Sequence, residues 1–172
     1  MDNFKIGESI CEYLLNRNHR DVAFIGGNKI IFSNLERMHG YKAALEKKNI
    51  KLTNDYIVHG AFTVESGREA CNKLLKKKIP ITAICCANDN IAVGALQCLQ
   101  DNNIKVPENV SLISVGNLPI SGYSIPAITT AAIPLYELGV KSTEFLCGKY
   151  KMKEEILKLP FKIIERDSVI KL

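Results

Sequence analysis

The stretch from Ile81 to Leu99 constrains the fold most, because a short polar turn joins a strand pattern directly to a helix pattern. Residues 81–86 are apolar apart from Thr82, which is typical of a strand buried on both faces of a parallel sheet. In open α/β sheets, ligands bind outside the carboxyl ends of the strands, beside helix N-termini. Asn88 lies at such a point, where its amide can bind a ligand. The alternative is that Asn88 or Asp89 only caps the following helix.

The same alternation of strand and helix patterns runs along the whole chain. Predicted strands cover residues 22–25, 56–58, 81–86, 110–115, 128–133 and 159–164. Predicted helices cover residues 4–16, with Asp2 or Asn3 as cap, and the segment that follows Ser33 or Asn34, either of which can cap it. Further helices are predicted through 67–75 and 88–100, and Pro134 opens one more. Residues 118–126 are predicted to form a loop. The alternation indicates an α/β fold with a doubly wound parallel sheet flanked by helices.

Three further side chains are candidates: Phe62 and Asn117 lie just beyond predicted strands, and Arg37 falls on the first turns of a predicted helix, close to the carboxyl edge of the preceding strand. Arg37 is either a partner for a surface ion pair or a forked donor that reaches into a cleft. Phe62 is either a core residue or a stacking platform for a ligand ring. Asn117 ends the strand at 110–115. The Gly26-Gly27 pair lacks the spacing of a phosphate-binding loop, so nucleotide binding is not expected.

Composition and the remaining motifs argue against several classes of function. The net charge of +5 comes from dispersed lysines, and no nucleic-acid-binding motif is visible. The six cysteines form no CxxC pair, which favours small core residues in a reducing compartment over disulfides or a metal site. No nucleophile–base pair stands out, so neither an enzyme nor a cofactor is predicted. The chain has no signal-peptide core and no run of transmembrane length, which predicts a cytoplasmic protein.

Several segments in a fixed order carry a family resemblance. They are NHRDVAFIGG at 18–27, ERMHGY at 36–41, FTVESG at 62–67, PITAI at 80–84, ANDNIAVGAL at 87–96, VPENVSLISVG at 106–116 and ITT at 128–130. Each segment is weak alone, but the ordered set is highly specific. Together they closely resemble the effector-binding domain of the lactose/galactose repressor (LacI/GalR) family.

The resemblance implies a periplasmic-binding-protein-like fold of type I, in which two subdomains close around a small molecule. Residues 1–132 then correspond to the C-terminal effector-binding subdomain. Residues 133–158 correspond to a segment of an otherwise missing N-terminal subdomain, and 159–172 to a return strand and tail. The apolar stripe of the helix after Pro134 is therefore expected to find cover elsewhere, by dimerisation or domain exchange.

The resemblance also implies roles for single residues. Arg37 and Asn88 match positions that bind the effector, and Phe62 matches an aromatic residue that packs against it. Ser33 and Ile31 fall in a loop that often lines the pocket. Asn117 matches a position where the family usually has an aspartate, and an amide weakens charge-assisted bonds to sugar hydroxyls.

The predicted function is the ligand-sensing and dimerisation part of a LacI-type transcriptional regulator. The expected partners are a small-molecule effector of the sugar, sugar phosphate or purine class and a second copy of the chain. DNA would be bound only through a helix-turn-helix headpiece that is absent from these 172 residues. The alternative is a sugar-binding module of a transport system, which shares the fold.

Overall fold

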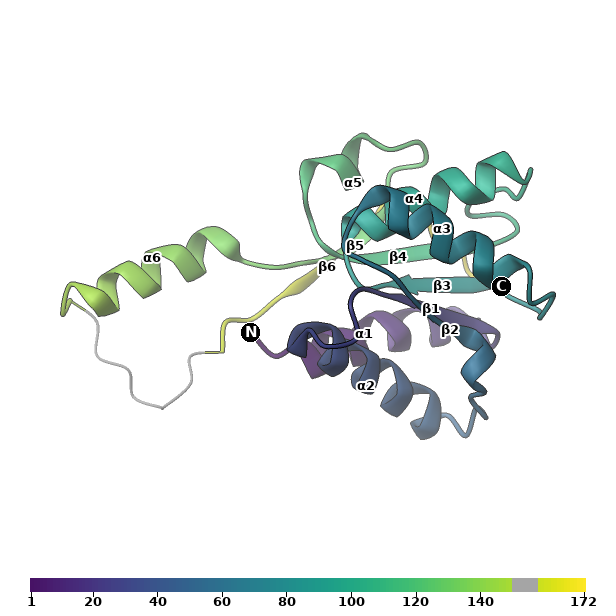
Figure 1. Ribbon diagram of the computed structural model, residues 1–172. Helices are drawn as coiled ribbons and strands as arrows, with labels where there is room; N and C mark the ends of the chain where they lie inside the picture. Colours follow the sequence, from purple (N-terminus) through teal and green to yellow (C-terminus); the bar gives the residue numbers. More distant parts are fainter. Residues whose placement is uncertain (150–157) are drawn as a thin grey trace.

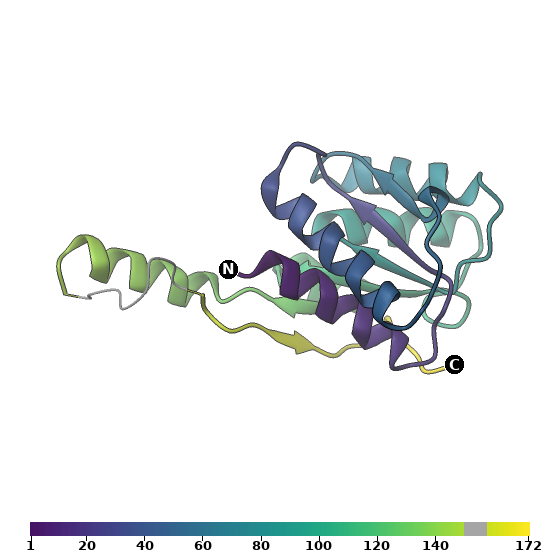
Figure 2. The same cartoon turned by 90° about the horizontal axis from the view of Figure 1, so that it is seen from below.

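A computed structural model describes residues 1–149 and 158–172, and it places one six-stranded sheet between two layers of helices (Figures 1 and 2). The strands are β1 (Val22–Gly26), β2 (Ile57–His59), β3 (Ala83–Cys86), β4 (Ser111–Gly116), β5 (Thr129–Ala132) and β6 (Lys162–Ile164). Their order in the sheet is β2-β1-β3-β4-β5-β6. All neighbouring pairs are parallel except β5 and β6, which are antiparallel. The predicted doubly wound α/β sheet is therefore confirmed, with one antiparallel edge strand.

The helices divide between the two faces of the sheet. They are α1 (Asn3–Leu15), α2 (Phe32–Lys47), α3 (Val64–Leu75), α4 (Asp89–Asp101), α5 (Pro119–Tyr123) and α6 (Leu135–Leu146), with a 3₁₀ turn at Asn54–Tyr56. Helices α1 and α2 pack together on one face, and α3, α4 and α5 pack on the other (Figure 1). Strand β2 is added to one side of β1, whereas β3 and the later strands are added to the other side, so the topological switch point lies between β1 and β3.

Side-chain caps explain where three of the helices begin. The carboxylate of Asp2 accepts a hydrogen bond from the Lys5 amide (2.9 Å), and Thr63 and Asn88 cap α3 and α4 in the same way. The predicted caps of α2 are wrong, because α2 begins after Ile31 without any side-chain cap. Asn34 is instead fully buried, and its amide is held by the turn that follows β1.

Three further expectations need correction. Residues 118–126 are not all loop, since they include α5, which begins with Pro119 in the first turn. Pro134 caps α6 rather than occupying its first turn. Of the six cysteines, five are buried as expected, whereas Cys147 is exposed beyond the end of α6.

Glycines let the paired helices approach until their backbones touch. A Cβ atom on Gly7 of α1 would lie 2.0 Å from the Arg37 carbonyl oxygen, and one on Gly40 of α2 would lie 2.0 Å from the Phe4 carbonyl oxygen. On the other face, a Cβ atom on Gly94 of α4 would lie 1.9 Å from the Val64 carbonyl oxygen. Both helix layers are therefore packed more closely than any side chain at these positions would permit.

Helix α6 stands away from the rest of the protein (Figures 1 and 2) and has no buried residue. Leu135, Phe145 and Leu146 of the predicted stripe are 57%, 48% and 83% exposed. The predicted segment 133–158 includes residues 150–157, which lie outside the described residues. The predicted division of the chain into domains therefore stays a prediction. Within the described ranges, no helix combines the length and apolar character needed to cross a membrane.

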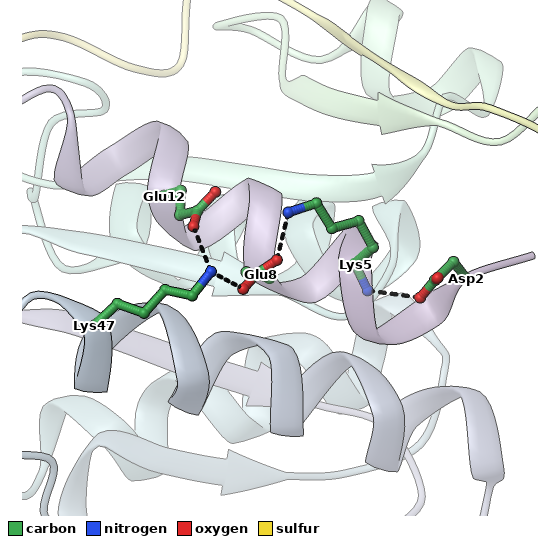
Figure 3. A network of polar contacts seen from close by, with 5 residues as sticks. All are labelled: Asp2, Lys5, Glu8, Glu12 and Lys47. Carbon is green, nitrogen blue, oxygen red and sulfur yellow. Dashed lines mark hydrogen bonds and ion pairs between the residues drawn. The ribbon is translucent and has the colours of Figure 1, made fainter.

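A charge network joins α1 to α2 (Figure 3). The Glu8 carboxylate is only 4% exposed, and it accepts hydrogen bonds from Lys47 of α2 and from Lys5 (2.5 Å). The ammonium of Lys47 also approaches Glu12, at 3.4 Å. The hydrogen bonds from Lys47 and Lys5 hold the pKa of Glu8 below its ordinary value of 4.5.

Replacing Glu8 is expected to weaken this junction in a pH-dependent way. Glu8→Gln should lower the free energy of unfolding by about 1 kcal/mol at neutral pH, because it removes two charge-assisted hydrogen bonds. A lowered folded-state pKa stabilises the protein fully above the unfolded pKa, and this contribution is lost as the pH falls through the folded pKa. Urea unfolding of both proteins at pH 7 and at decreasing pH below 4.5 should show the difference shrinking.

Glu12→Gln provides the control, because Glu12 shares Lys47 at a longer distance and its side chain is 32% exposed. Its effect should stay within about 0.5 kcal/mol. An undiminished difference between wild type and Glu8→Gln in acid would contradict this role for the Glu8 carboxylate.

Candidate functional site

The residues singled out from the sequence gather at the carboxyl edge of the sheet, around the switch point. Arg37 reaches this edge from the second turn of α2, and its Nη1 donates a hydrogen bond to the Ala87 carbonyl (2.6 Å) after β3. Its Nε donates to the side-chain oxygen of Asn3 (3.1 Å). Burial lowers the pKa of Arg37 to about 10, against an opposing effect of Asp89. The guanidinium therefore stays charged at neutral pH. Arg37 is buried, and it forms no ion pair with the residues that the structure describes, so the surface pair considered from the sequence is not seen among them.

Asn88 follows Ala87 and is half-buried at the N-terminus of α4. Its Oδ1 accepts a hydrogen bond from the Ile91 amide (2.9 Å), so Asn88 caps the helix. Only an acceptor can pair with that N–H group, which leaves the Nδ2 group turned away from the cap. Capping and ligand binding are therefore compatible, since they use different atoms of one amide.

Asn117 follows β4 in the left-handed region, with φ of 63°, which asparagine tolerates better than most residues. Its Oδ1 accepts a hydrogen bond from Nη2 of Arg166 (2.7 Å). Arg166 also donates to the Ile128 carbonyl (2.6 Å) and to Ser121 Oγ (3.3 Å), and so fixes the loop after β4. The amide side chain is thereby held in one orientation.

Asp89 ties the Asn88 and Asn117 loops together. Its carboxylate is fully buried and accepts hydrogen bonds from Ser114 Oγ (2.5 Å), Thr130 Oγ1 (2.8 Å) and the Leu118 amide (2.6 Å). These partners lie on β4, on β5 and in the loop between them. Asp89 therefore places the loop after β4 against the N-terminus of α4.

Phe62 lies at the same edge, over the turn after β1. A Cβ atom on Gly27 would lie 2.4 Å from the Phe62 ring, so the ring packs flat against this glycine. The Phe62 carbonyl accepts a hydrogen bond from Nδ2 of Asn90 (3.3 Å). The ring is half-buried and packs against the core, so part of its surface stays accessible.

The turn after β1 is held by Asn34 and His59. Asn34 accepts from the Gly27 amide (2.8 Å) and donates to the Asn28 carbonyl (3.2 Å). Nδ1 of His59 lies 3.3 Å from the Gly27 carbonyl oxygen. Burial, followed by the charges of Lys29 and Lys42, lowers the pKa of His59. The imidazole is therefore neutral at pH 7, with its Nδ1 proton donated to Gly27.

Ser33 and Ile31 lie at the start of α2, beside this turn. Ile31 is 41% exposed, and its neighbours Ile30 and Phe32 are more exposed still. Ser33 is half-buried, and its hydroxyl forms no hydrogen bond with the residues that the structure describes. The side chains of both residues are thus accessible near the carboxyl edge of the sheet, but among the described residues no hydrogen bond joins them to Arg37 or Asn88.

A cavity of about 410 Å³ adjoins Asn117, between the strand ends and the segments that lead to and from α6. It is lined by Asn117, Ala132, Ile133, Pro134, Glu137, Pro160, Phe161 and Lys162. Within residues 1–149 and 158–172, no cluster of three His, Cys, Asp or Glu side chains is placed to hold a metal ion. The edge offers fixed hydrogen-bond donors and an aromatic face, which suit reversible binding of a small polar molecule.

Sequence patterns missed three residues that organise this edge. Asp89 and Asn34 were considered only as helix caps, and Arg166 was not singled out. Each of them acts through partners on other elements, at separations of up to 49 residues, as between Arg166 and Asn117. The available signal for Asp89 was a carboxylate in the first turn of the helix, close to the apolar run 91–96.

Known proteins give a consistent picture of the chain. A family profile described as "Periplasmic binding protein-like domain" matches residues 11–169. The HTH-type transcriptional repressor PurR of Histophilus somni (strain 2336) is 31% identical over 98% of this chain and 51% of its own length. The HTH-type transcriptional regulator AscG of Escherichia coli (strain K12) is 34% identical over 73% of this chain and 37% of its own.

Solved structures agree. A sugar-binding transcriptional regulator of the LacI family from Escherichia coli, complexed with phosphate, superposes with a TM-score of 0.90 and 29% identity, over 99% of this chain and 62% of that one. The chain spans about half the length of the curated PurR relative. The relatives are transcriptional regulators, which favours a regulator's effector-binding domain over a transport module or an enzyme. The chain therefore belongs to the periplasmic binding protein-like family, among the effector-binding domains of LacI-family transcriptional regulators.

Proposed function

We propose that the chain is the effector-sensing part of a cytoplasmic transcriptional regulator, and that it binds a small molecule at the carboxyl edge of its sheet. One observation carries the proposal: Arg37 donates to the Ala87 carbonyl at 2.6 Å, which brings its guanidinium beside the Asn88 amide at the switch point. Ligands of open α/β sheets bind at this place. Arg37, Asn88, Asn117 and Phe62 are the proposed contacts, with Ser33 and Ile31 on the rim.

The proposed effector belongs to the sugar, sugar phosphate or purine class. A hydroxyl-rich or heterocyclic molecule can use the amide and guanidinium donors, while its ring stacks on the exposed face of Phe62. In the intact protein, binding would shift the equilibrium between DNA-binding and non-binding states. DNA contact would be made by a helix-turn-helix headpiece outside these 172 residues.

A homodimer is the proposed assembly. Tyr123 and Ile125 are 86% and 84% exposed beside α5, next to the half-exposed Ile120. Apolar side chains gathered in this way on one surface are typical of protein interfaces. Sedimentation of the chain at increasing concentration tests the dimer independently of the ligand.

The ligand site is tested by separating the two roles of Asn88. Asn88→Ser is expected to keep the cap, because serine also accepts from the Ile91 amide, but it removes the Nδ2 donor. The melting temperature should stay near that of the wild type, while affinity for a bound effector falls about fivefold to tenfold. Thermal-shift titrations with glucose, glucose 6-phosphate and hypoxanthine, one probe from each class, measure both quantities.

The matched control is Asn72→Ser on the exposed surface of α3, which should alter neither quantity. If none of the three probes raises the melting temperature, or if Asn88→Ser leaves every affinity unchanged, the proposed site is contradicted.

A further inference from the structure

We propose that the effector carries an oxyanion, a carboxylate or phosphate group, which binds between Arg37, Asn88 and Asn117. This inference rests on the proposed function and narrows its ligand class. It follows from which atoms of the three side chains are already used within the protein, and which remain for a ligand.

Both amides at the edge are fixed in orientation by groups that can only donate. Oδ1 of Asn88 is held by a backbone N–H, that of Ile91. Oδ1 of Asn117 is held by the guanidinium of Arg166 at 2.7 Å. Neither amide can be turned around without placing its NH₂ group against another donor. With each oxygen turned toward its donor, the NH₂ donors are the groups that both side chains leave wholly unused.

Arg37 adds a charged donor to these two amides. Its Nε and Nη1 are bonded to Asn3 and Ala87, and its Nη2 has no hydrogen-bond partner among the residues that the structure describes. The same holds for the Nδ2 atoms of Asn88 and Asn117. A guanidinium N–H and two amide NH₂ groups are all donors, and together they fit a group that only accepts, as an ionised oxyanion does.

The surrounding charges agree with this reading. Asp89 is the buried carboxylate of the edge, and three protein donors already surround it. The charges of Lys29, in the turn after β1, and of Lys42 add to the effect of burial in lowering the pKa of His59. Glu137 lines the cavity beside Asn117, together with Lys162 of opposite charge.

Asn117 also explains why a neutral sugar fits less well. A sugar hydroxyl can donate and accept, and its donated hydrogen needs an acceptor in the site. An aspartate at position 117 would offer one free oxygen even while bound to Arg166. The amide has a single oxygen, which already accepts from Arg166, so it is a poorer acceptor for a hydroxyl hydrogen than a carboxylate would be, at a cost in affinity.

The experiment compares charged and neutral probes on the 172-residue chain. Inorganic phosphate, glucose 6-phosphate, glucuronate and glucose are titrated in thermal-shift assays, with sodium chloride keeping the ionic strength constant. We expect the anions to raise the melting temperature, and glucose 6-phosphate to bind at least about tenfold more tightly than glucose. Asn117→Asp should weaken anion binding at least about tenfold, because it keeps the Arg166 contact but turns a carboxylate oxygen toward the anion.

Asn103→Asp is the matched control. It makes the same change of charge at an exposed residue of similar conformation, with φ of 57°, beyond the opposite end of α4. Its anion affinity should equal that of the wild type. Equal losses in both variants would indicate a general charge effect and overturn the oxyanion site.

The outcomes separate this inference from the proposed function. Glucose or hypoxanthine binding that is lost in Asn88→Ser, without any effect of the anions, would retain the ligand site but overturn the oxyanion. No stabilisation by any probe would contradict both.

Discussion

Gly94→Ala should lower the free energy of unfolding by about 3 kcal/mol or more, a large part of the stability of a domain of this size. An alanine in the middle of an exposed helix would stabilise it by about 1 kcal/mol relative to glycine. Here the added Cβ atom would lie 1.9 Å from the Val64 carbonyl oxygen and 2.6 Å from the Arg68 nitrogen. Both atoms are backbone, so the contact can be relieved only by moving α3 away from α4.

Urea unfolding measures this loss, and Gly139→Ala is its control. Nothing lies within 4 Å of a Cβ atom at Gly139, in the middle of α6. That variant should not be destabilised, because the propensity effect then acts alone. If Gly94→Ala unfolded at the same urea concentration as the wild type, the close backbone contact between α3 and α4 would be wrong.

This contact illustrates what a sequence conveys and what it does not. The strand and helix patterns predicted the parallel sheet, because apolar periodicity is a local property. Gly67 and Gly94 fit that pattern as ordinary members of their helices. Their importance comes from the other helix, and no local pattern records which residues of two helices meet.

In the candidate site, too, local patterns identified some residues, whereas contacts between distant segments could not be predicted. Asn88 was found because it lies just beyond a predicted strand, and Arg37 because the first turns of its helix lie close to the end of the preceding strand; parallel strands end at a common edge. The assignment of Asn34 as a cap was wrong, since its amide satisfies the buried turn at Gly27 instead of the start of α2. The orientation of Asn117 depends on Arg166, which returns to the edge only at the end of the chain. Such tertiary contacts decide which atoms face a ligand.

Asp89→Ala is expected to cost about 3–5 kcal/mol, because it removes a fully buried carboxylate and leaves three donors without an acceptor. The loss should also release the loop after β4, since the Leu118 amide is one of those donors. Asn117 is the neighbour of Leu118, so affinity for any ligand that contacts Asn117 should fall as well. Urea unfolding and thermal-shift titration with glucose 6-phosphate measure the two effects separately.

Two variants show whether the carboxylate acts as described. Asp89→Asn keeps one oxygen, and its NH₂ group can donate to the hydroxyls of Ser114 and Thr130, so its loss should be closer to about 1 kcal/mol. Asp101→Ala, at the other end of α4, breaks a pair with Arg68 in which the aspartate side chain is 53% exposed, and should change stability by less than about 0.5 kcal/mol. The loss in the free energy of unfolding should therefore decrease in the order Asp89→Ala, Asp89→Asn, Asp101→Ala, because burial and the number of donors left without an acceptor decrease in the same order. Losses of equal size would mean that Asp89 acts only as one more acidic residue at a helix end, where its charge favours the N-terminus.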